Sequence, residues 1–241
     1  NHHHSSPGPI VAKGNGPKSE NQMRDFFEGR IATQIAALPA GEHELAFDID
    51  GFSVCAKLRR EKGTLPLVVM FHGAVDQKFR TPPVFVGFIP SLFGKAHQIA
   101  IADPSIRAGS PVRLAWYAGE DGFPSQDIVA DLISGVAAAL GASRRVYFGT
   151  SGGGFAALYF SHRDAGSFVI AGNPQVKIEN YTSSSVITRY RLSCWPKLAK
   201  NDGINQVTCA DLTALYGQGY ANTVIYVQTS GDRPHVENHM L

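Results

Sequence analysis

The sequence predicts an α/β fold in which a mainly parallel sheet, opened by an antiparallel hairpin, carries helices on both faces. Short apolar runs recur along the chain, as expected for strands buried inside a parallel sheet. Segments with helical spacing of apolar residues lie between them, which is typical of βαβ units. The chain has 241 residues, of which 44% are hydrophobic, so one domain with a sizeable core is expected.

The N-terminal residues, the net charge and the lack of a long apolar run narrow the class of protein further. Residues 1–9 include three consecutive histidines and are typical of a purification tag and linker, so the domain is expected over residues 10–241. A formal net charge of +2, with Lys and Arg scattered, argues against a nucleic-acid partner. No stretch approaches the ~18 apolar residues of a membrane span. A soluble protein is predicted, with the cytoplasm favoured over secretion, while the compartment and the oligomeric state stay open.

The first predicted element is a β-hairpin. Two alternating runs, 45–49 and 52–56, flank the dipeptide Asp50-Gly51. Asp-Gly suits the positive φ angles of a tight turn between antiparallel strands, so the pattern predicts a hairpin at one edge of the sheet.

The remaining strands and the clearest helix follow in order. A helix is predicted over 126–140, because Ile128, Leu132 and Val136 recur at near-helical spacing after a candidate cap, Ser125. The strands expected to form the parallel sheet are 65–71, 97–102, 145–148, 167–171 and 223–227.

One region interrupts this alternation. From about 174 to 206 the chain carries a Thr/Ser cluster, several basic residues and the aromatics Tyr181, Tyr190 and Trp195. Inserted segments of this kind often form a lid over a site, so we expect a lid-like insertion here. The three aromatic side chains are candidates to line an acyl or sugar site.

The sharpest chemical signal is the segment 149–154, Gly-Thr-Ser-Gly-Gly-Gly, between a predicted strand and a predicted helix. Gly149, Ser151 and Gly153 match the G-x-S-x-G pattern of a nucleophile elbow in its required context. The turn is so tight that side chains beside the serine would collide with backbone, which explains the glycines. A phosphate-binding loop is disfavoured, because the Gly-Lys-Ser/Thr ending of a P-loop is missing. Ser151 is therefore the candidate nucleophile.

The hairpin, the His72-Gly73 pair after the run 65–71 and the Ser151 elbow together resemble the α/β-hydrolase superfamily of serine esterases, lipases and acyltransferases. The resemblance runs from about Glu44 to the C-terminus. In that superfamily the residue after the nucleophile and the loop after the third strand donate backbone N–H groups to an oxyanion hole. The resemblance therefore implies Gly152 as one donor and Ala74 or Val75 as the other, with His72 orienting the loop.

A nucleophilic serine also needs a base and an orienting carboxylate, which in this superfamily follow it in the order acid, then histidine. The resemblance implies Asp232, after the run 223–227, as the acid of the catalytic triad. His235 and His239 are both candidates for the base, with His235 favoured because it is closer to the strand. A base on a segment beyond Leu241 is a third alternative.

Glu179 is an alternative acid, since some members of the superfamily place the acid after the sixth strand. Asp103 is expected to cap the turn that it forms with Pro104, and His97 and His162 are expected to be structural. The three cysteines have no metal-ligand spacing, although Cys194 and Cys209 are a candidate disulfide pair. No metal or organic cofactor is implied.

A finer likeness covers residues 145–175. The elbow together with Gly172-Asn173-Pro174-Gln175 is similar to hydrolase-like proteins associated with bacterial surface-glycan and glycoprotein secretion systems. The first hypothesis for function is a serine hydrolase that cleaves a carboxylic ester of a small molecule or glycan through an acyl-enzyme on Ser151. The alternatives are an acyltransferase acting on glycan hydroxyls and a non-catalytic scaffold.

Overall fold

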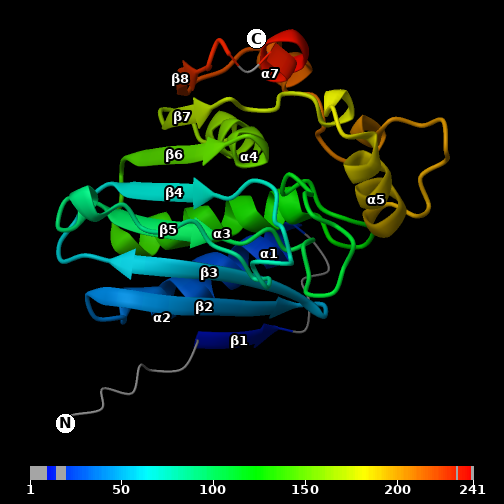
Figure 1. Ribbon diagram of the computed structural model, residues 1–241. Helices are drawn as coiled ribbons and strands as arrows, with labels where there is room; N and C mark the ends of the chain where they lie inside the picture. The colour runs from blue at the N-terminus through cyan, green and yellow to red at the C-terminus, as the bar shows by residue number, and fades with distance from the viewer. Residues whose placement is uncertain (1–9, 15–19, 232, 240–241) are drawn as a thin grey trace.

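The computed structural model describes residues 10–14, 20–231 and 233–239. Residues 1–9, where a tag is predicted, lie outside this part of the chain, as does Asp232. The described residues fold around one eight-stranded sheet with the order β1-β2-β3-β5-β4-β6-β7-β8 (Figure 1). Pairs β2/β3 and β3/β5 are antiparallel and the other neighbours are parallel. This is the mainly parallel sheet with an antiparallel hairpin that the sequence predicts.

The strands are β1 (Ile10–Gly14), β2 (Gly41–Ile49), β3 (Phe52–Arg60), β4 (Leu67–Phe71), β5 (His97–Ile101), β6 (Arg145–Thr150), β7 (Phe168–Gly172) and β8 (Thr223–Val227). The α-helices are α1 (Glu20–Asp25), α2 (Ala32–Ala36), α3 (Ser125–Leu140), α4 (Gly152–His162), α5 (Ser184–Cys194), α6 (Leu212–Tyr216) and α7 (Arg233–His239). A π-helical turn (Phe26–Ile31) joins α1 to α2, and short 3₁₀ turns lie at Pro90–Leu92, Ile178–Asn180 and Ile204–Gln206.

The hairpin turns where the sequence predicts it. Asp50 and Gly51 have φ angles of 51° and 82°, and the Asp48 carboxylate accepts a 3.1 Å hydrogen bond from the Gly51 N–H. Two positive φ angles in a two-residue loop match the right-handed twist of the flanking strands. Strand β3 thus runs antiparallel to both of its neighbours, β2 and β5.

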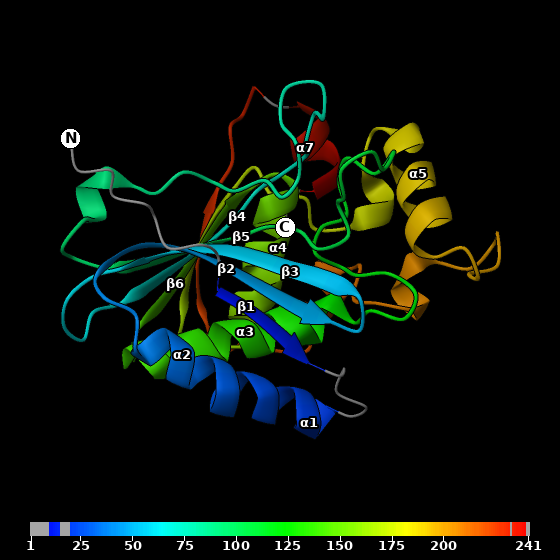
Figure 2. The ribbon, with the colours of Figure 1, turned by 90° about the horizontal axis from the view of Figure 1, so that it is seen from below.

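The sheet is covered differently on its two faces. Figure 2 shows α1, α2 and α3 on one face. Phe27 of the π-helical turn, Ile128 of α3 and Phe155 of α4 belong to one large core cluster there. The opposite face is covered by the segment between β4 and β5, whose apolar side chains pack on Val68 and Met70. Strands β4 and β5 are buried along their whole length, because both of their faces are covered.

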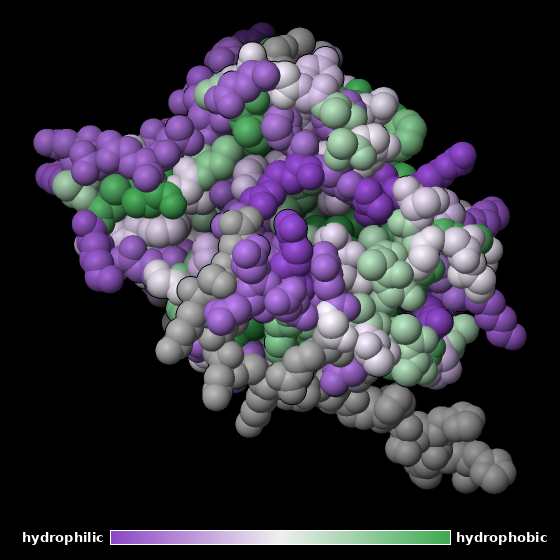
Figure 3. Space-filling view, turned by 180° about the vertical axis from the view of Figure 1, so that it is seen from behind, coloured by the Kyte–Doolittle hydropathy of each residue, from purple (hydrophilic) through white to green (hydrophobic). Residues whose placement is uncertain are grey.

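Figure 3 views the molecule from behind, on the side of α1, α2 and α3, and shows hydrophilic and hydrophobic residues interspersed over this face. None of the helices within the described ranges has the length and apolar character needed to cross a membrane. All three cysteines are free, so the candidate pair Cys194 and Cys209 is not a disulfide in this structure.

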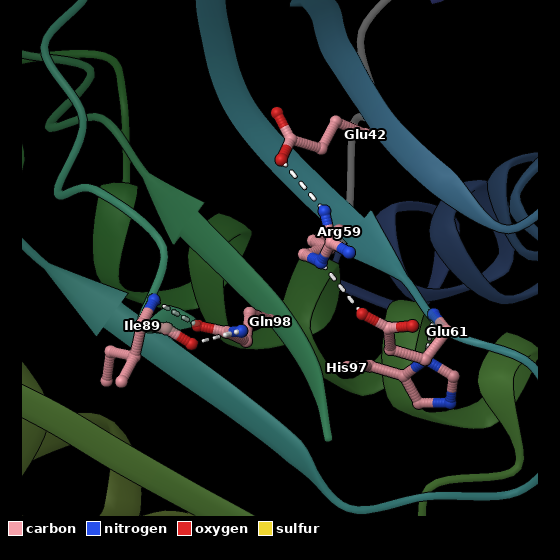
Figure 4. A network of polar contacts seen from close by, with 6 residues as sticks. All are labelled: Glu42, Arg59, Glu61, Ile89, His97 and Gln98. Carbon is pink, nitrogen blue, oxygen red and sulfur yellow. Dashed lines mark hydrogen bonds and ion pairs between the residues drawn. The ribbon is translucent and has the colours of Figure 1, made fainter. Parts of the chain in front are cut away.

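Two histidines expected to be structural hold loops far from the elbow. His97 begins β5, and its Nδ1 accepts a 3.0 Å hydrogen bond from the Glu61 N–H, next to the ion pairs of Arg59 with Glu42 and Glu61 (Figure 4). His162, at the end of α4, contacts the Gly219 carbonyl at 2.9 Å. Both imidazoles tie strand or helix ends to neighbouring chain.

Candidate active site

Ser151 lies at the turn between β6 and α4 and has φ 54° and ψ −121°. A non-glycine residue in this region is strained and persists only where its surroundings fix it. Here the Ser151 N–H donates to the Gly172 carbonyl at 3.0 Å, and its carbonyl accepts from the Gly154 and Gln175 N–H groups at 3.0 and 3.1 Å. The strained turn is thus fixed by α4, by the end of β7 and by the start of the segment that follows β7.

The glycines of the elbow are required by space. A Cβ on Gly149 would lie 2.0 Å from the Gly153 carbonyl oxygen, and a Cβ on Gly153 would lie 2.4 Å from the Phe71 carbonyl oxygen. Neither distance is compatible with a side chain, because both neighbours are backbone atoms. The G-x-S-x-G pattern therefore reflects the close approach of β6, α4 and the end of β4.

The loop after β4 passes directly beside the serine. A Cβ on Gly73 would lie 3.7 Å from Ser151 Cβ and 3.9 Å from Gly152 N. As the first residue of α4, Gly152 has no acceptor for its N–H within the helix, and the helix N-terminus favours negative charge. The loop after β4 and the start of α4 therefore lie next to each other beside Ser151.

The expected donors of the loop differ in their surroundings. The Val75 N–H donates to the Arg113 carbonyl at 2.7 Å, and the Arg113 side chain donates back to the Val75 carbonyl at 3.3 Å. Val75 is buried, and its N–H is engaged by residue 113, which the sequence could not reveal. Ala74 is exposed and closer in the chain to Gly73, so it is the better candidate of the two.

His72 is held as a neutral imidazole. Its Nε2 accepts a 3.1 Å hydrogen bond from the Asp103 N–H, so its Nδ1 carries the proton and donates to the Gly73 carbonyl at 2.7 Å. Burial lowers the pKa of His72 to about 4. His72 thus orients the loop beside Ser151 and is not available as a base.

Asp103 holds the turn at the end of β5, as expected. Its carboxylate accepts hydrogen bonds from the Ser105 and Tyr117 N–H groups at 3.1 and 2.8 Å. The Tyr117 hydroxyl in turn donates to the Ile101 carbonyl at 2.7 Å and accepts from the His72 N–H at 3.1 Å. Burial raises the pKa of Asp103 to about 7, because the charged carboxylate is desolvated there.

The side chain that contacts the Ser151 hydroxyl is Gln175. Its Nε2 donates to Ser151 Oγ at 3.1 Å, and its Oε1 accepts a hydrogen bond from the Trp116 indole N–H. Gln175 and Trp116 are buried, with 0% and 1% of their surface exposed. Sequence reasoning missed both residues as part of the site. A signal existed for Gln175, because it follows the strand beside the elbow strand in a parallel sheet, where strand ends meet.

The candidate bases lie in α7, whose last residue reaches the same segment. His239 is buried, and its Nδ1 lies 3.4 Å from the Val176 N–H, one residue beyond Gln175. The Tyr226 hydroxyl of β8 donates to the His239 carbonyl at 2.8 Å and ties the end of α7 to the sheet. The side chain of His235 lies outside the described part of the chain, as does the candidate acid Asp232.

Glu179, the alternative acid, is placed in the short 3₁₀ turn after β7. Its carboxylate accepts a 2.9 Å hydrogen bond from the Ile204 N–H and lies against Gly203. Glu179 therefore joins the start of the segment 174–206 to its end.

The aromatic residues of this segment are part of the core instead of lining an open site. Tyr190 and Trp195 are buried, and the Trp195 indole donates to the Tyr190 hydroxyl at 2.9 Å. The rings of Tyr181 and Tyr190 pack edge-to-face on Trp116, with centroids 5.6 and 5.5 Å away. The expectation that all three line an acyl or sugar site is therefore wrong for Tyr190 and Trp195. Tyr190 packs on the indole that contacts Gln175, and Trp195 hydrogen-bonds to Tyr190.

A cavity of about 380 Å³ lies beside the loop that follows β4. Its charged lining residues are Asp76 and Lys78 of this loop, Arg113 and, from α5, Arg189. Arg113 pairs with Asp76 at 3.4 Å, which leaves the lining with an excess of positive charge. Asp76, which lines the cavity, is three residues after Gly73. The cavity thus lies between the loop after β4 and α5, which is placed beyond the strand ends (Figure 1).

No model of a known protein family matches the chain, and no curated protein matches its sequence. Solved structures do share its fold. The Glycosylation Associate Protein (Gap123) complex from Streptococcus agalactiae superposes with a TM-score of 0.53 at 17% identity over 81% of this chain. Acetyl Xylan Esterase 1 from Thermoanaerobacterium sp. JW/SL YS485 superposes with a TM-score of 0.51 at 12% identity, covering 89% of this chain and 87% of the esterase.

This chain has the α/β-hydrolase fold. The fold predicted from the hairpin, the His72-Gly73 loop and the Ser151 elbow is thereby confirmed. The match covers only 44% of the Gap123 chain, so this chain spans less than half of that protein.

Proposed function

We propose that the chain is a serine hydrolase that cleaves a carboxylic ester through an acyl-enzyme on Ser151. The observation that carries this proposal is the strained Ser151 backbone, with φ 54°, at the tip of a turn between a strand and a helix. Such strain is retained at functional sites, and this turn exposes the serine hydroxyl in α/β-hydrolases. The likeness of the fold to an esterase is consistent with the proposal.

In the proposed reaction, Ser151 Oγ attacks the ester carbonyl while a base takes its proton. The carbonyl oxygen becomes negative and accepts hydrogen bonds from the Gly152 N–H and from the Ala74 N–H of the loop beside it. The alcohol leaves with the proton that the base returns, and water then releases the acid from the acyl-enzyme. Donors fixed beforehand stabilise the oxyanion without reorganisation, which is why the rigid loop after β4 matters.

We infer that His239 is the base. Its buried imidazole contacts the N–H of Val176, and the preceding residue, Gln175, holds Ser151 Oγ. To act as the base, the imidazole would exchange this 3.4 Å contact for one with the Ser151 hydroxyl. Asp232 is the proposed acid and His235 the alternative base.

A second candidate function is transfer of the acyl group to a glycan hydroxyl. Hydrolysis and transfer share the acyl-enzyme and differ only in whether water or a sugar hydroxyl attacks it. The names of the two structural neighbours, a glycosylation-associated complex and an esterase of acetylated xylan, motivate this candidate. Release of acid and formation of acylated sugar are measured together with an acceptor present; transfer predicts that the sugar product exceeds the acid.

The cavity beside the loop after β4 supports a preference for esters that carry a negative charge. Lys78, Arg113 and Arg189 outnumber Asp76 in its lining. We expect Arg189→Gln to raise the KM of an anionic ester several-fold and to leave the KM of a neutral ester unchanged. Lys200→Gln is the matched control, because Lys200 is also an exposed basic residue of the segment 174–206 but does not line the cavity. Equal KM values for the anionic ester in both variants would remove this part of the proposal.

The proposed function is tested by turnover of an activated acetyl ester. Ser151→Ala should lose at least about a thousandfold in kcat while the thermal unfolding curve is retained. Ser185→Ala, at an exposed position of α5, is the control and should keep full activity. Undiminished turnover by the Ser151 variant would exclude Ser151 as the nucleophile, and no turnover by the folded, unsubstituted chain would leave the non-catalytic scaffold as the better account.

A further inference from the structure

We propose that Gln175 is a further catalytic residue, whose side-chain N–H stabilises negative charge on Ser151 Oγ when the acyl-enzyme breaks down. This inference rests on the proposed function. It starts from the contact between the two side chains, in which Gln175 Nε2 lies 3.1 Å from Ser151 Oγ. Gln175 also donates its backbone N–H to the Ser151 carbonyl at 3.1 Å, so both parts of the residue hold the serine.

The orientation of the Gln175 amide is fixed by its other neighbour. An amide offers an oxygen that only accepts and a nitrogen that only donates. The indole N–H of Trp116 is a donor, so the atom facing it must be Oε1 of Gln175. The nitrogen must then face Ser151, and an inverted amide would leave two donors facing each other in a buried site.

Trp116 is itself held firmly. It is 1% exposed, has a φ of 53° and is enclosed by the rings of Tyr181 and Tyr190. A bulky residue with a positive φ is uncommon and costs free energy, and such strain gathers where a side chain must be aimed. The chain of contacts from Trp116 through Gln175 to Ser151 is therefore built to present an N–H group to the nucleophile.

A donor at this place has a defined effect on the chemistry. The amide nitrogen of Gln175 cannot accept a hydrogen bond, so the hydroxyl hydrogen of Ser151 must point away from it and can be donated to the proposed base. In the second half of the reaction, water attacks the acyl carbon and gives a proton to the base. The bond between the acyl carbon and Oγ then breaks, its electron pair stays on Oγ, and the proton returns from the base to Oγ.

In deacylation, negative charge develops on Ser151 Oγ as its bond to the acyl carbon breaks. The Gln175 N–H therefore stabilises the leaving oxygen during deacylation, as donors fixed in place do for a developing oxyanion. In acylation the N–H already binds the neutral Ser151 hydroxyl before the reaction, so the contact lowers the ground state as well as the transition state. In the acyl-enzyme Oγ is an ester oxygen, which is a weaker acceptor, so the contact strengthens more when the bond to the acyl carbon breaks. Gln175 is thus expected to speed deacylation much more than acylation.

The test separates these two steps with an activated acetyl ester, by measuring the burst of alcohol release and the later steady rate. Gln175→Met keeps the length of the side chain and removes the N–H. We expect Gln175→Met to lower the steady rate on the order of tenfold or more, while the rate of the burst stays nearly unchanged. Acetyl-Ser151 should then accumulate and be seen by mass spectrometry. Burst and steady rate falling together, or neither changing, would overturn the proposal.

Two further variants keep the inference falsifiable if methionine disturbs packing. Trp116→Phe leaves Gln175 intact but frees its amide to invert. Deacylation should therefore slow, by a smaller factor than in Gln175→Met. Gln175→Glu can donate to Oγ only when it is protonated, so its deacylation rate relative to the unsubstituted chain should rise as pH falls. A flat ratio across pH in a folded Glu variant would contradict the role of the N–H.

Failure of this inference and failure of the proposed function give different results. If the unsubstituted chain shows no burst and no acetyl-Ser151, the proposed function fails. If the unsubstituted chain shows both, only the role of Gln175 fails when Gln175→Met and Trp116→Phe have the same ratio of deacylation rate to acylation rate as the unsubstituted chain.

Discussion

The backbone of Gly73 lies so close to Ser151 that a Cβ on it would be 3.7 Å from Ser151 Cβ and 3.9 Å from Gly152 N. These are ordinary van der Waals distances, so the fold can accept a methyl group there. The same methyl group would occupy the space in which the proposed oxyanion accepts its hydrogen bonds. An alanine at position 73 is therefore expected to lower activity without lowering stability.

We expect Gly73→Ala to lower kcat by on the order of a hundredfold, the effect of losing an oxyanion-hole donor, with little change in unfolding temperature. Gly87→Ala is the matched control, since a Cβ there has nothing within 4 Å. The measurement is steady-state turnover together with thermal unfolding of both variants. Full activity in the Gly73 variant would show that the oxyanion does not lie beside this loop.

Gly149→Ala is expected to affect stability instead. Its Cβ would lie 2.0 Å from the Gly153 carbonyl oxygen, and backbone atoms cannot move aside without disrupting the turn. We expect a loss of more than about 3 kcal/mol in the free energy of unfolding, the range of severe core overpacking. Gly29→Ala, whose Cβ would lie in open space, should be neutral or slightly stabilising in denaturant titrations. Similar unfolding midpoints for the two variants would contradict the observed close approach.

His72 predicts a stability that depends on pH. Burial lowers its pKa from 6.5 to about 4, so the unfolded chain binds a proton at a pH where the native chain does not. The stability due to this difference is present above about pH 6.5 and is lost as pH falls to about 4. It amounts to about 3 kcal/mol, from 1.36 kcal/mol per pKa unit. In urea titrations, His72→Gln should lack this loss.

Asp103 acts in the opposite direction. Its pKa is raised from 3.8 to about 7, so the native chain holds a proton that the unfolded chain has released. Its contribution is full below about pH 3.8 and is lost as pH rises to about 7. The two slopes oppose each other between about pH 4 and 6.5, so the unsubstituted chain should show a flatter profile than either variant. A steeper decline with rising pH for Asp103→Asn than for the unsubstituted chain would contradict this assignment.

The two histidines of α7 are compared in a pair of variants. With His239 as the base, His239→Gln should reduce both the burst and the steady turnover of an activated ester by about a thousandfold or more, while His235→Gln retains activity. The reverse pattern would assign the base to His235. Equal activity of both variants with the unsubstituted chain would exclude both residues as the base.

The sequence predicted those features that depend on local pattern. Asp50-Gly51 between alternating runs predicts the hairpin, and the apolar run that contains Leu67–Phe71 predicts a strand buried on both faces. The elbow glycines were predictable because the turn geometry dictates them. The helical segment 20–36 is not among the predicted elements, although Phe27, Ile31 and Ile35 recur at a spacing of four and are all buried.

Other features depend on contacts between distant residues and leave little local trace. The bond from the Val75 N–H to the Arg113 carbonyl joins residues far apart in the chain and removes one predicted oxyanion donor. Tyr190 and Trp195 looked like residues of a lid, because an aromatic residue in a polar segment has the same pattern whether it packs inward or faces a ligand. The contact of Trp116 with Gln175 also spans 59 positions, so only the fold brings it to Ser151.

The central claim is that Ser151 is an activated nucleophile, and labelling with a fluorophosphonate probe tests it most directly. The probe reacts with a serine hydroxyl only where a base and an oxyanion site assist it, and mass spectrometry of the peptides identifies the modified residue. We predict a single adduct on Ser151 that is absent from the Ser151→Ala variant. A folded, unsubstituted chain that forms no adduct on Ser151 would contradict the account.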